Sequence, residues 1–198
     1  MKIVCDYREN RVIALLNKAK ASNNKYNDIE CDSQNLTVGD FLIGNVIIER
    51  KTLNDLASSI LDGRYKEQCH RLQQLQSEQN IKVIYFIEGN INLFIGHHNI
   101  TKNTLISAII SIVYEHNFNM IMTNHMNETC DYLLKLCLKY YTKYDPSLNQ
   151  KCNENATVNL DQISNNDSNA SISLSDANSQ SDSLANIENL VKQQRKKK

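Results

Sequence analysis

The segment GDFLIGNVIIERK, residues 39–51, is the most informative part of the chain. Phe41–Ile43 and Val46–Ile48 are two apolar runs of residues that favour β-strands. Gly44-Asn45 between them is a two-residue signal for a tight primed turn, so the segment predicts a β-hairpin. Pairing outward from the turn places Ile43 opposite Val46, Leu42 opposite Ile47, Phe41 opposite Ile48 and Asp40 opposite Glu49.

This hairpin brings two carboxylates and an amine to one of its faces. Asp40 and Glu49 are opposed in the predicted register, and like charges on opposed residues repel unless a cation lies between them. Lys51 lies two residues beyond Glu49 and therefore points to the same face. Two carboxylates and an ammonium are what phosphodiester hydrolysis with a hard divalent ion requires. The alternative is a solvent-exposed hairpin end that carries ordinary surface charges.

The residues around the hairpin resemble the XPF family of structure-specific DNA endonucleases. Gly39-Asp40, Glu49-Arg50-Lys51 and Asp55 match the family signature GD…ERKxxxD. The match continues through Leu56–Gln68, whose DGRYKEQ run is most similar to the crossover-junction endonuclease branch. Upstream, Asp6–Glu9 resembles the D-x-R-E at the strand end that opens the XPF nuclease domain.

The resemblance covers about residues 2–143 and implies both a fold and an activity. The implied fold is the restriction-endonuclease-like α/β fold, a mixed sheet flanked by helices. The implied activity is Mg²⁺- or Mn²⁺-dependent hydrolysis of phosphodiester bonds in branched DNA, such as flaps, forks and junctions, for repair or recombination. The alternatives are a non-catalytic DNA-binding or dimerisation scaffold of the same family, or a nuclease of simpler duplex specificity. Retention of the motif acids argues for activity.

Three acids are the candidate metal ligands. Asp40 and Glu49 fit because Mg²⁺ favours a few carboxylates together with water and phosphate oxygens. Asp6, at the end of the first predicted strand, joins them by resemblance alone, and a turn aspartate is its alternative. Lys51 is expected to orient the attacking water or to stabilise the transition state through its charge, and less readily to act as a neutral base.

Arg50 and Asp55 complete the candidate catalytic residues, which are Asp40, Glu49, Arg50, Lys51 and Asp55. Arg50 alternates to the face opposite Lys51, so we expect it to fix the hairpin against acidic neighbours or to reach a phosphate from the side. Asp55 follows Thr52 by three residues, and helix capping alone explains that pattern. Its motif role would then be to position the helix, and with it Arg50 or Lys51.

Arg64 and Gln68 are the candidate DNA-binding residues, together with Arg50. They lie four residues apart on a predicted helix and so share a face. Both match the family, which implies contact with the DNA backbone. A solvated helix face is the alternative.

Hydrophobic periodicity predicts the remaining elements outward from the hairpin. Strands are expected at residues 2–6, near 29, at 81–87 and at 118–123. Helices are expected at residues 10–20, at 53–61 after a Thr52 cap, at 64–79, at 101–115 and at 128–143. This order indicates a layered α/β domain with a mixed sheet.

Composition divides the chain into a folded part, residues 1–145, and a tail, residues 146–198. The resemblance implies that the folded part is an XPF-type nuclease domain. The first part can bury a core without a metal or disulfide staple. The six cysteines form no CxxC pair, no signal peptide is recognised, and no apolar run could span a bilayer, so we expect a soluble intracellular protein with reduced thiols. Because the formal net charge is zero, any DNA-facing positive surface must be local.

The tail is rich in Asn, Ser and Asp and predicts disorder. Its basic end, residues 194–198, fits a nuclear-import signal, a nucleic-acid tether or a solubilising end. Family enzymes commonly carry a tandem helix-hairpin-helix domain at this place, so a partner would have to supply branch specificity.

The resemblance also implies pairing of nuclease domains, as a homodimer or as a heterodimer with a related subunit. The helix at 101–115 or the last helix is the candidate interface, and an ordinary core role for both is the alternative. The expected location is the nucleus or, for a viral protein, the place where viral DNA is processed.

Overall fold

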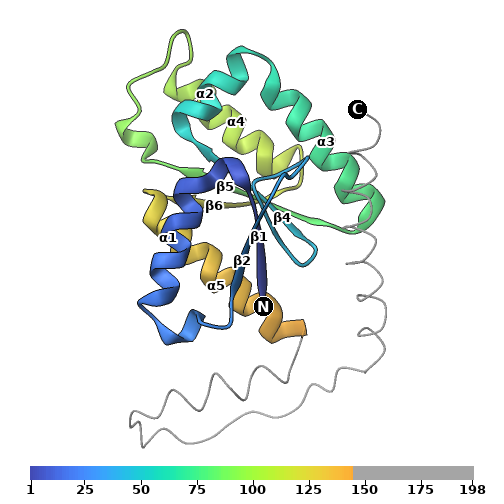
Figure 1. Ribbon diagram of the computed structural model, residues 1–198. Helices are drawn as coiled ribbons and strands as arrows, with labels where there is room; N and C mark the ends of the chain where they lie inside the picture. The colour runs from blue at the N-terminus through green and yellow to red at the C-terminus, as the bar shows by residue number, and fades with distance from the viewer. Residues whose placement is uncertain (145–198) are drawn as a thin grey trace, which may run out of the picture.

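One six-stranded sheet organises residues 1–144, which are the residues described by this computed structural model (Figure 1). The predicted tail, its basic end and Cys152 lie outside the described residues. In spatial order the strands are β2 (Glu30–Gln34), β1 (Lys2–Asp6), β3 (Phe41–Ile43), β4 (Val46–Thr52), β5 (Lys82–Glu88) and β6 (Asn119–Thr123). β3 is antiparallel to β1 and β4, and every other pair is parallel. The predicted mixed sheet is therefore confirmed.

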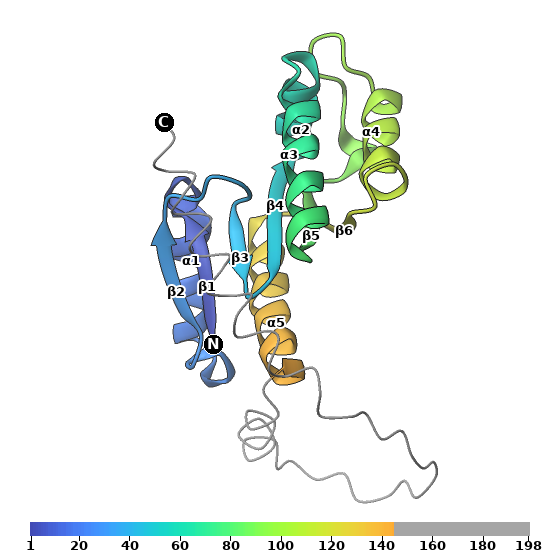
Figure 2. The same cartoon turned by 90° about the vertical axis from the view of Figure 1, so that its right-hand side faces the viewer.

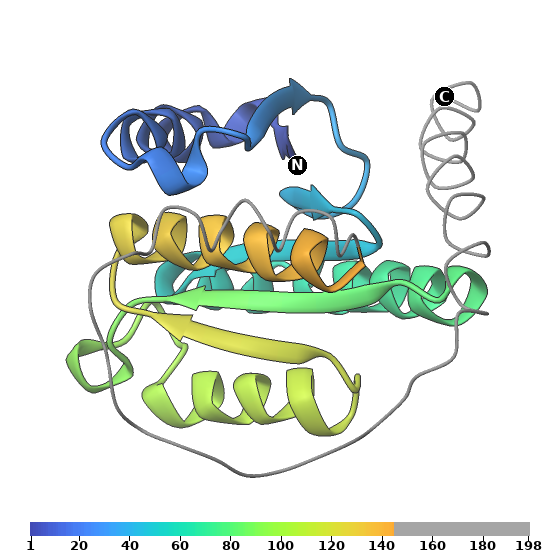
Figure 3. The ribbon, with the colours of Figure 1, turned by 90° about the horizontal axis from the view of Figure 1, so that it is seen from below.

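Helices cover both faces of this sheet. They are α1 (Asn10–Ala21), α2 (Leu53–Leu61), α3 (Arg64–Gln79), α4 (Lys102–Tyr114) and α5 (Met126–Tyr144), with short 3-10 turns η1 (Tyr7–Glu9), η2 (Asn24–Tyr26) and η3 (Ile91–Leu93). α1 and α5 pack on one face, and α2, α3 and α4 gather on the other (Figure 2). Seen from below, β5 and β6 run side by side between α5 and α4 (Figure 3).

Each face has its own apolar core because β4 and β5 are buried on both sides. Ile48 and Phe86 belong to the core under α1 and α5, whereas Ile47 and Tyr85 belong to the core under α2, α3 and α4. Successive side chains of a strand point to opposite faces. The polar residues that end β4 are therefore divided between the two layers, which positions the site described below.

The predicted hairpin register is confirmed at three pairs and wrong at the fourth. Phe41–Ile48, Leu42–Ile47 and Ile43–Val46 pair as expected. The ladder ends there, so Asp40 and Glu49 are not a strand pair. The backbone N–H of Asp40 donates instead to the carbonyl of Ile48 at 2.8 Å.

The turn of the hairpin packs against α5. Gly44 has φ +55° and Asn45 does not have a positive φ, which matches a turn that needs glycine only at its first central residue. The backbone N–H of Asn45 donates to the hydroxyl of Tyr140 at 3.2 Å. None of the helices within residues 1–144 has the length and apolar character needed to cross a membrane.

Candidate active site

Several strand ends meet at one edge of the sheet. β1, β4 and β5 run in the same direction, so their carboxyl-terminal ends lie at this edge, and the reversed strand β3 begins there. Ligands of open α/β sheets bind outside the carboxyl ends of the strands. Asp6, Asp40, Glu88 and the segment Glu49–Thr52 lie at this edge.

Asp40 and Glu49 form the acidic centre of the edge. The Asp40 carboxylate accepts the backbone N–H of Arg50 through Oδ2 at 2.8 Å. Burial raises the pKa of Asp40 well above its ordinary value, and the neighbouring charge of Glu49 raises it further. Glu49 is 3 % exposed, and burial raises its pKa although Lys51 and Gln68 act in the opposite direction. The charge of Glu49 thus opposes ionisation of Asp40, the effect expected of two neighbouring carboxylates.

The ammonium of Lys51 lies beside these acids, on the face predicted for it. Its Nζ is 3.4 Å from Glu49 Oε1 and donates to Gln68 Oε1 at 2.8 Å. Gln68 comes from α3, so two layers of the fold fix the position of the amine.

Arg64 and Gln68 do not share one environment, although the sequence placed them on one helix face. Gln68 is half-buried against Lys51. Arg64 has 67 % of its side chain exposed and pairs with Asp62 at 2.6 Å. The structure therefore exposes Arg64 to solvent and places Gln68 against Lys51, and their contact with DNA stays a prediction.

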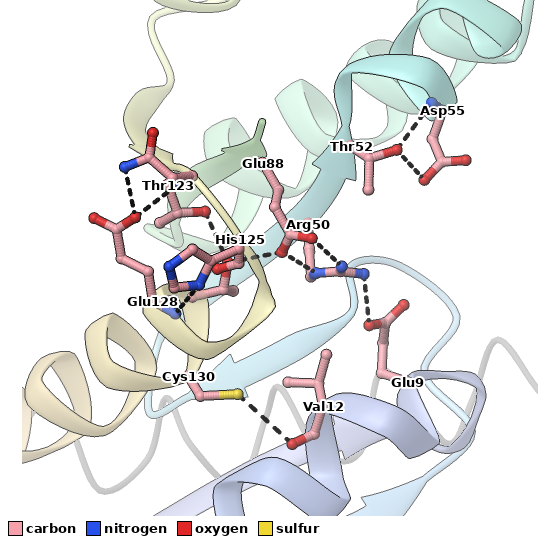
Figure 4. Close-up of polar contacts among 12 residues, drawn as sticks. Glu9, Val12, Arg50, Thr52, Asp55, Glu88, Thr123, His125, Glu128 and Cys130 are labelled. Carbon is pink, nitrogen blue, oxygen red and sulfur yellow. Dashed lines mark hydrogen bonds and ion pairs between the residues drawn. The ribbon is translucent and has the colours of Figure 1, made fainter. Parts of the chain in front are cut away.

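Arg50 points through the opposite face of the sheet, as the strand alternation predicts (Figure 4). Its Nε and Nη2 bind the two oxygens of Glu88 at 2.9 and 2.7 Å, and its Nη1 binds Glu9 at 3.1 Å. Its side chain is 9 % exposed and faces acidic neighbours in this structure, and its contact with a phosphate stays a prediction. Burial alone would lower the pKa of Arg50, but the bonds and charges of Glu88 and Glu9 raise it.

The acidic partners of Arg50 were not identified from the sequence. Glu9 appeared only inside a motif, and Glu88 was not singled out. The available signal for Glu88 was its place at the end of an apolar strand, the same place that Asp6 holds after β1. Its partner Thr129 lies 41 residues away along the chain, where local patterns carry no information.

The carboxylate of Asp6 accepts four hydrogen bonds. The donors are the backbone N–H and the Nε and Nη2 of Arg8 and the backbone N–H of Leu36. Burial alone would raise the pKa of Asp6, but these bonds hold it below its ordinary value. Asp6 touches the site through its backbone N–H, which donates to the carbonyl of Asp40 at 2.8 Å.

Asp55 lies in the first turn of α2, which Thr52 caps, and this matches the alternative given for it from the sequence. Thr52 Oγ1 accepts the backbone N–H of Asp55 at 3.1 Å and donates to Asp55 Oδ2 at 2.6 Å (Figure 4). Asp55 is exposed and makes no hydrogen bond to Arg50 or Lys51. It orients the start of α2, the helix that follows Lys51 directly.

The carboxylates at this edge are candidate ligands for the divalent cation that the family resemblance implies. Asp40 and Glu49 are neighbouring hard oxygen donors whose ionised forms a cation between them would favour. Among residues 1–144, no group of three or more His, Cys, Asp and Glu side chains is arranged to hold a metal. Asp40 and Glu49 fit an ion held by carboxylates, with other positions left for water and phosphate oxygens. The Asp6 carboxylate bonds Arg8 and Leu36 in this structure, and its place as a third ligand stays a prediction.

Comparison with known proteins supports the resemblance. The ERCC4 domain model matches residues 5–136. Crossover junction endonuclease MUS81 of Candida glabrata is 36 % identical over 106 residues, which are 54 % of this chain and 16 % of that protein. Structure-specific endonuclease subunit MUS81 of Danio rerio is 33 % identical over 115 residues, 58 % of this chain and 18 % of that protein. The chain thus matches less than a fifth of the length of these relatives.

The fold has close counterparts among solved structures. XPF from Aeropyrum pernix superposes with a TM-score of 0.59 at 21 % identity, covering 78 % of this chain and 72 % of that one. The same protein in complex with DNA gives a TM-score of 0.56 at 23 % identity, covering 72 % and 65 %. With a matching domain model over two thirds of its length, the chain belongs to the ERCC4 domain family, and its described residues form an XPF-type nuclease domain.

Proposed function

We propose that this protein is a divalent-metal-dependent endonuclease that hydrolyses phosphodiester bonds in branched DNA, such as flaps, forks and junctions. The observation that carries the proposal is the acidic pair of half-buried Asp40 and buried Glu49, with Lys51 Nζ 3.4 Å from Glu49 Oε1. The names of the MUS81 relatives and the DNA complex of XPF support the substrate class. Repair or recombination is the proposed setting, in the nucleus or, for a viral protein, where viral DNA is processed.

Each residue of the site has a task in this proposal. Asp40 and Glu49 would hold Mg²⁺ or Mn²⁺, which supplies Lewis-acid activation of the scissile phosphate. The charge of Lys51 would stabilise the phosphate oxygens as negative charge develops, because a preorganised cation in a water-poor site acts strongly. Gln68 would keep the ammonium in place.

Two arginines near the edge are proposed to bind the DNA backbone. Arg8 has 61 % of its side chain exposed while its guanidinium is held by buried Asp6. An arginine held in this way loses little freedom when it binds a phosphate. Arg64 is exposed on α3 and has only Asp62 as an ion-pair partner among the described residues. Asp6 thus becomes the anchor of Arg8 in this proposal, and Arg50 a buried support.

We further propose a homodimer or a heterodimer with a related subunit. One observation favours α4 over α5 as the surface through which the two subunits of this dimer would pair. α4 exposes an apolar row on the side away from the sheet, formed by Ile106, Ile110, Val113 and Tyr114. The Danio rerio relative is itself named a subunit.

The test is cleavage of labelled flap, fork, four-way junction and plain duplex DNA with Mg²⁺ or Mn²⁺, for the wild type and for Asp40→Ala, Glu49→Ala and Lys51→Ala. Asp131→Ala, an exposed acid on α5, is the matched control. We expect branched substrates to be cut by the wild type and the control and by none of the three variants. Cleavage of duplex DNA alone would replace the proposal by a simpler nuclease. DNA binding without cleavage, with or without a related subunit, would replace it by the non-catalytic scaffold.

A further inference from the structure

A chain of polar side chains, buried or half-buried, runs along the α1/α5 face of the sheet, on the side opposite Glu49 and Lys51. It begins at Glu9 in η1 and passes through the guanidinium of Arg50 on β4 to Glu88 on β5 (Figure 4). From Glu88 it continues to Thr129 on α5 and then to Thr123 on β6. The Oγ1 of Thr129 lies 2.8 Å from Glu88 Oε2 and 2.7 Å from Thr123 Oγ1. Both threonines are at most 2 % exposed. The chain thus ties together five elements at one edge of the sheet.

Arg50 is the residue that contacts both the polar chain and the acidic pair Asp40–Glu49. Its side chain binds Glu88 and Glu9 on the α1/α5 face, while its backbone N–H binds the Asp40 carboxylate at 2.8 Å. Its neighbours in sequence, Glu49 and Lys51, point to the other face. A rotation of the backbone at residue 50 would therefore move Glu49 and Lys51 and strain the bond from the Arg50 N–H to Asp40.

The fork of Arg50 resists such a rotation. Two parallel bonds to one carboxylate fix the plane of the guanidinium. Glu88 can hold that plane only if its own carboxylate is fixed, and the hydroxyl of Thr129 provides that second contact. Stability alone is a weak explanation, because well-packed apolar residues often replace a buried ion pair without loss of stability.

We propose that Glu88 and Thr129 are positioning residues for the Asp40–Glu49–Lys51 site and act on it through Arg50. The proposal rests on the nuclease function proposed above. The hydroxyl of Thr129 holds Glu88, Glu88 holds the guanidinium, and the guanidinium sets the direction in which β4 presents the acid and the amine.

The primary test compares Thr129→Val with Thr129→Ser, and uses Thr142→Val, on the same helix outside this chain, as the control. Two quantities are measured: the hydrogen-exchange rate of the Arg50 amide, and kcat and KM for the branched substrate that the wild type cuts best. For Thr129→Val we expect exchange at Arg50 to accelerate about fivefold or more, because local opening sets that rate. We expect kcat to fall about tenfold with KM changed less than about twofold, because small misplacement of reacting groups costs rate.

Thr129→Ser keeps the hydroxyl, so we expect the exchange rate of the Arg50 amide and kcat to stay at their wild-type values. Thr142→Val should likewise change neither. Glu88→Gln keeps the shape of the side chain and weakens its grip on Arg50, so it gives the same pattern if Thr129→Val does not fold. Faster exchange with unchanged kcat would overturn the positioning role and leave a structural one. Unchanged exchange in both Thr129→Val and Glu88→Gln would overturn the mechanism through Arg50. If the wild type cuts no DNA, the proposed function fails, while the exchange rate still decides whether Thr129 controls residue 50.

Discussion

At the scale of single residues, the neighbouring carboxylates Asp40 and Glu49 lower the stability of the metal-free protein, although the proposed cleavage reaction requires both. Burial and the charge of Glu49 raise the pKa of Asp40 above its ordinary 3.8. The folded protein therefore keeps a proton on Asp40 over a pH range in which the unfolded chain has released it. The free energy of unfolding of the metal-free protein then falls as pH rises from about 3.8 through the folded pKa.

Asp40→Asn should remove the fall in the free energy of unfolding with rising pH, and it should also abolish DNA cleavage. The amide oxygen of asparagine can still accept the N–H of Arg50, and it carries no charge beside Glu49. In the presence of a chelator we expect Asp40→Asn to be more stable than the wild type at neutral pH and to show a smaller decrease between pH 4 and neutrality. Urea titrations at a series of pH values measure this, with Asp131→Asn as the exposed control. A variant that is less stable than the wild type at neutral pH would contradict the cause given for the pKa shift.

Gln68→Leu should impair the reaction without unfolding the protein. The substitution keeps the size of the side chain and removes the oxygen that holds Lys51 Nζ at 2.8 Å. We expect kcat to fall about tenfold because a preorganised charge is displaced from the site. Gln74→Leu, on the exposed side of the same helix, should leave kcat unchanged. Equal rates for both variants would show that Lys51 does not depend on Gln68.

At the scale of elements, the hairpin depends on a close approach between its turn and α5. A methyl group built on Gly44 would overlap the ring of Tyr140, and the φ of +55° at this residue disfavours any side chain. We expect Gly44→Ala to destabilise the protein by about 2–4 kcal/mol, from backbone strain and overpacking together. Chemical denaturation measures the change.

The second substitution Tyr140→Ala separates the two causes. In Gly44→Ala/Tyr140→Ala the overlap is gone and the backbone strain remains, so Gly44→Ala should cost about 1–2 kcal/mol in that background. If Gly44→Ala destabilises the protein equally with Tyr140 and with Ala at position 140, then α5 shifts to accommodate the added methyl group and the overlap costs nothing.

Local patterns sufficed to predict most elements, because turns, caps and periodicity act over a few residues. The Thr52 cap and α3 at Arg64–Gln79 are found where they were expected. The site was predicted less completely. The end of the β3–β4 ladder, the four bonds of Asp6 and the contact of Gln68 with Lys51 all depend on side chains from separate elements. No spacing rule along one strand or helix describes such contacts.

At the scale of the whole molecule, the site lies where two separate cores meet. One core packs under α1 and α5 and the other under α2, α3 and α4. The end of β4 contributes Arg50 to the first side and Glu49 and Lys51 to the second. A change in either layer can therefore reach the site, so positioning residues are expected in both layers.

The outer surface of α4 leads to the last prediction. Ile110 and Tyr114 are 57 % and 85 % exposed on this helix, and Met122, on the same side of the edge strand β6, is 42 % exposed. An exposed apolar row such as that of α4 marks an interaction site more often than a free face. A second copy of the domain, or a related subunit with the same helix, would cover it by self-complementary packing, as a two-fold interface requires.

Ile110→Asp should therefore convert a dimer into a monomer. Sedimentation of the wild type at micromolar concentration is expected to give twice the mass of the chain, and the buried carboxylate of the variant should weaken association at least about a hundredfold. Ile95→Asp, which changes an equally apolar residue on the exposed loop before α4, should leave the dimer intact. A wild type that stays a strict monomer would remove the homodimer. A related subunit whose binding is lost in Ile110→Asp would then identify α4 as a heterodimer surface, whereas a subunit that binds the variant equally well would assign the interface to another face.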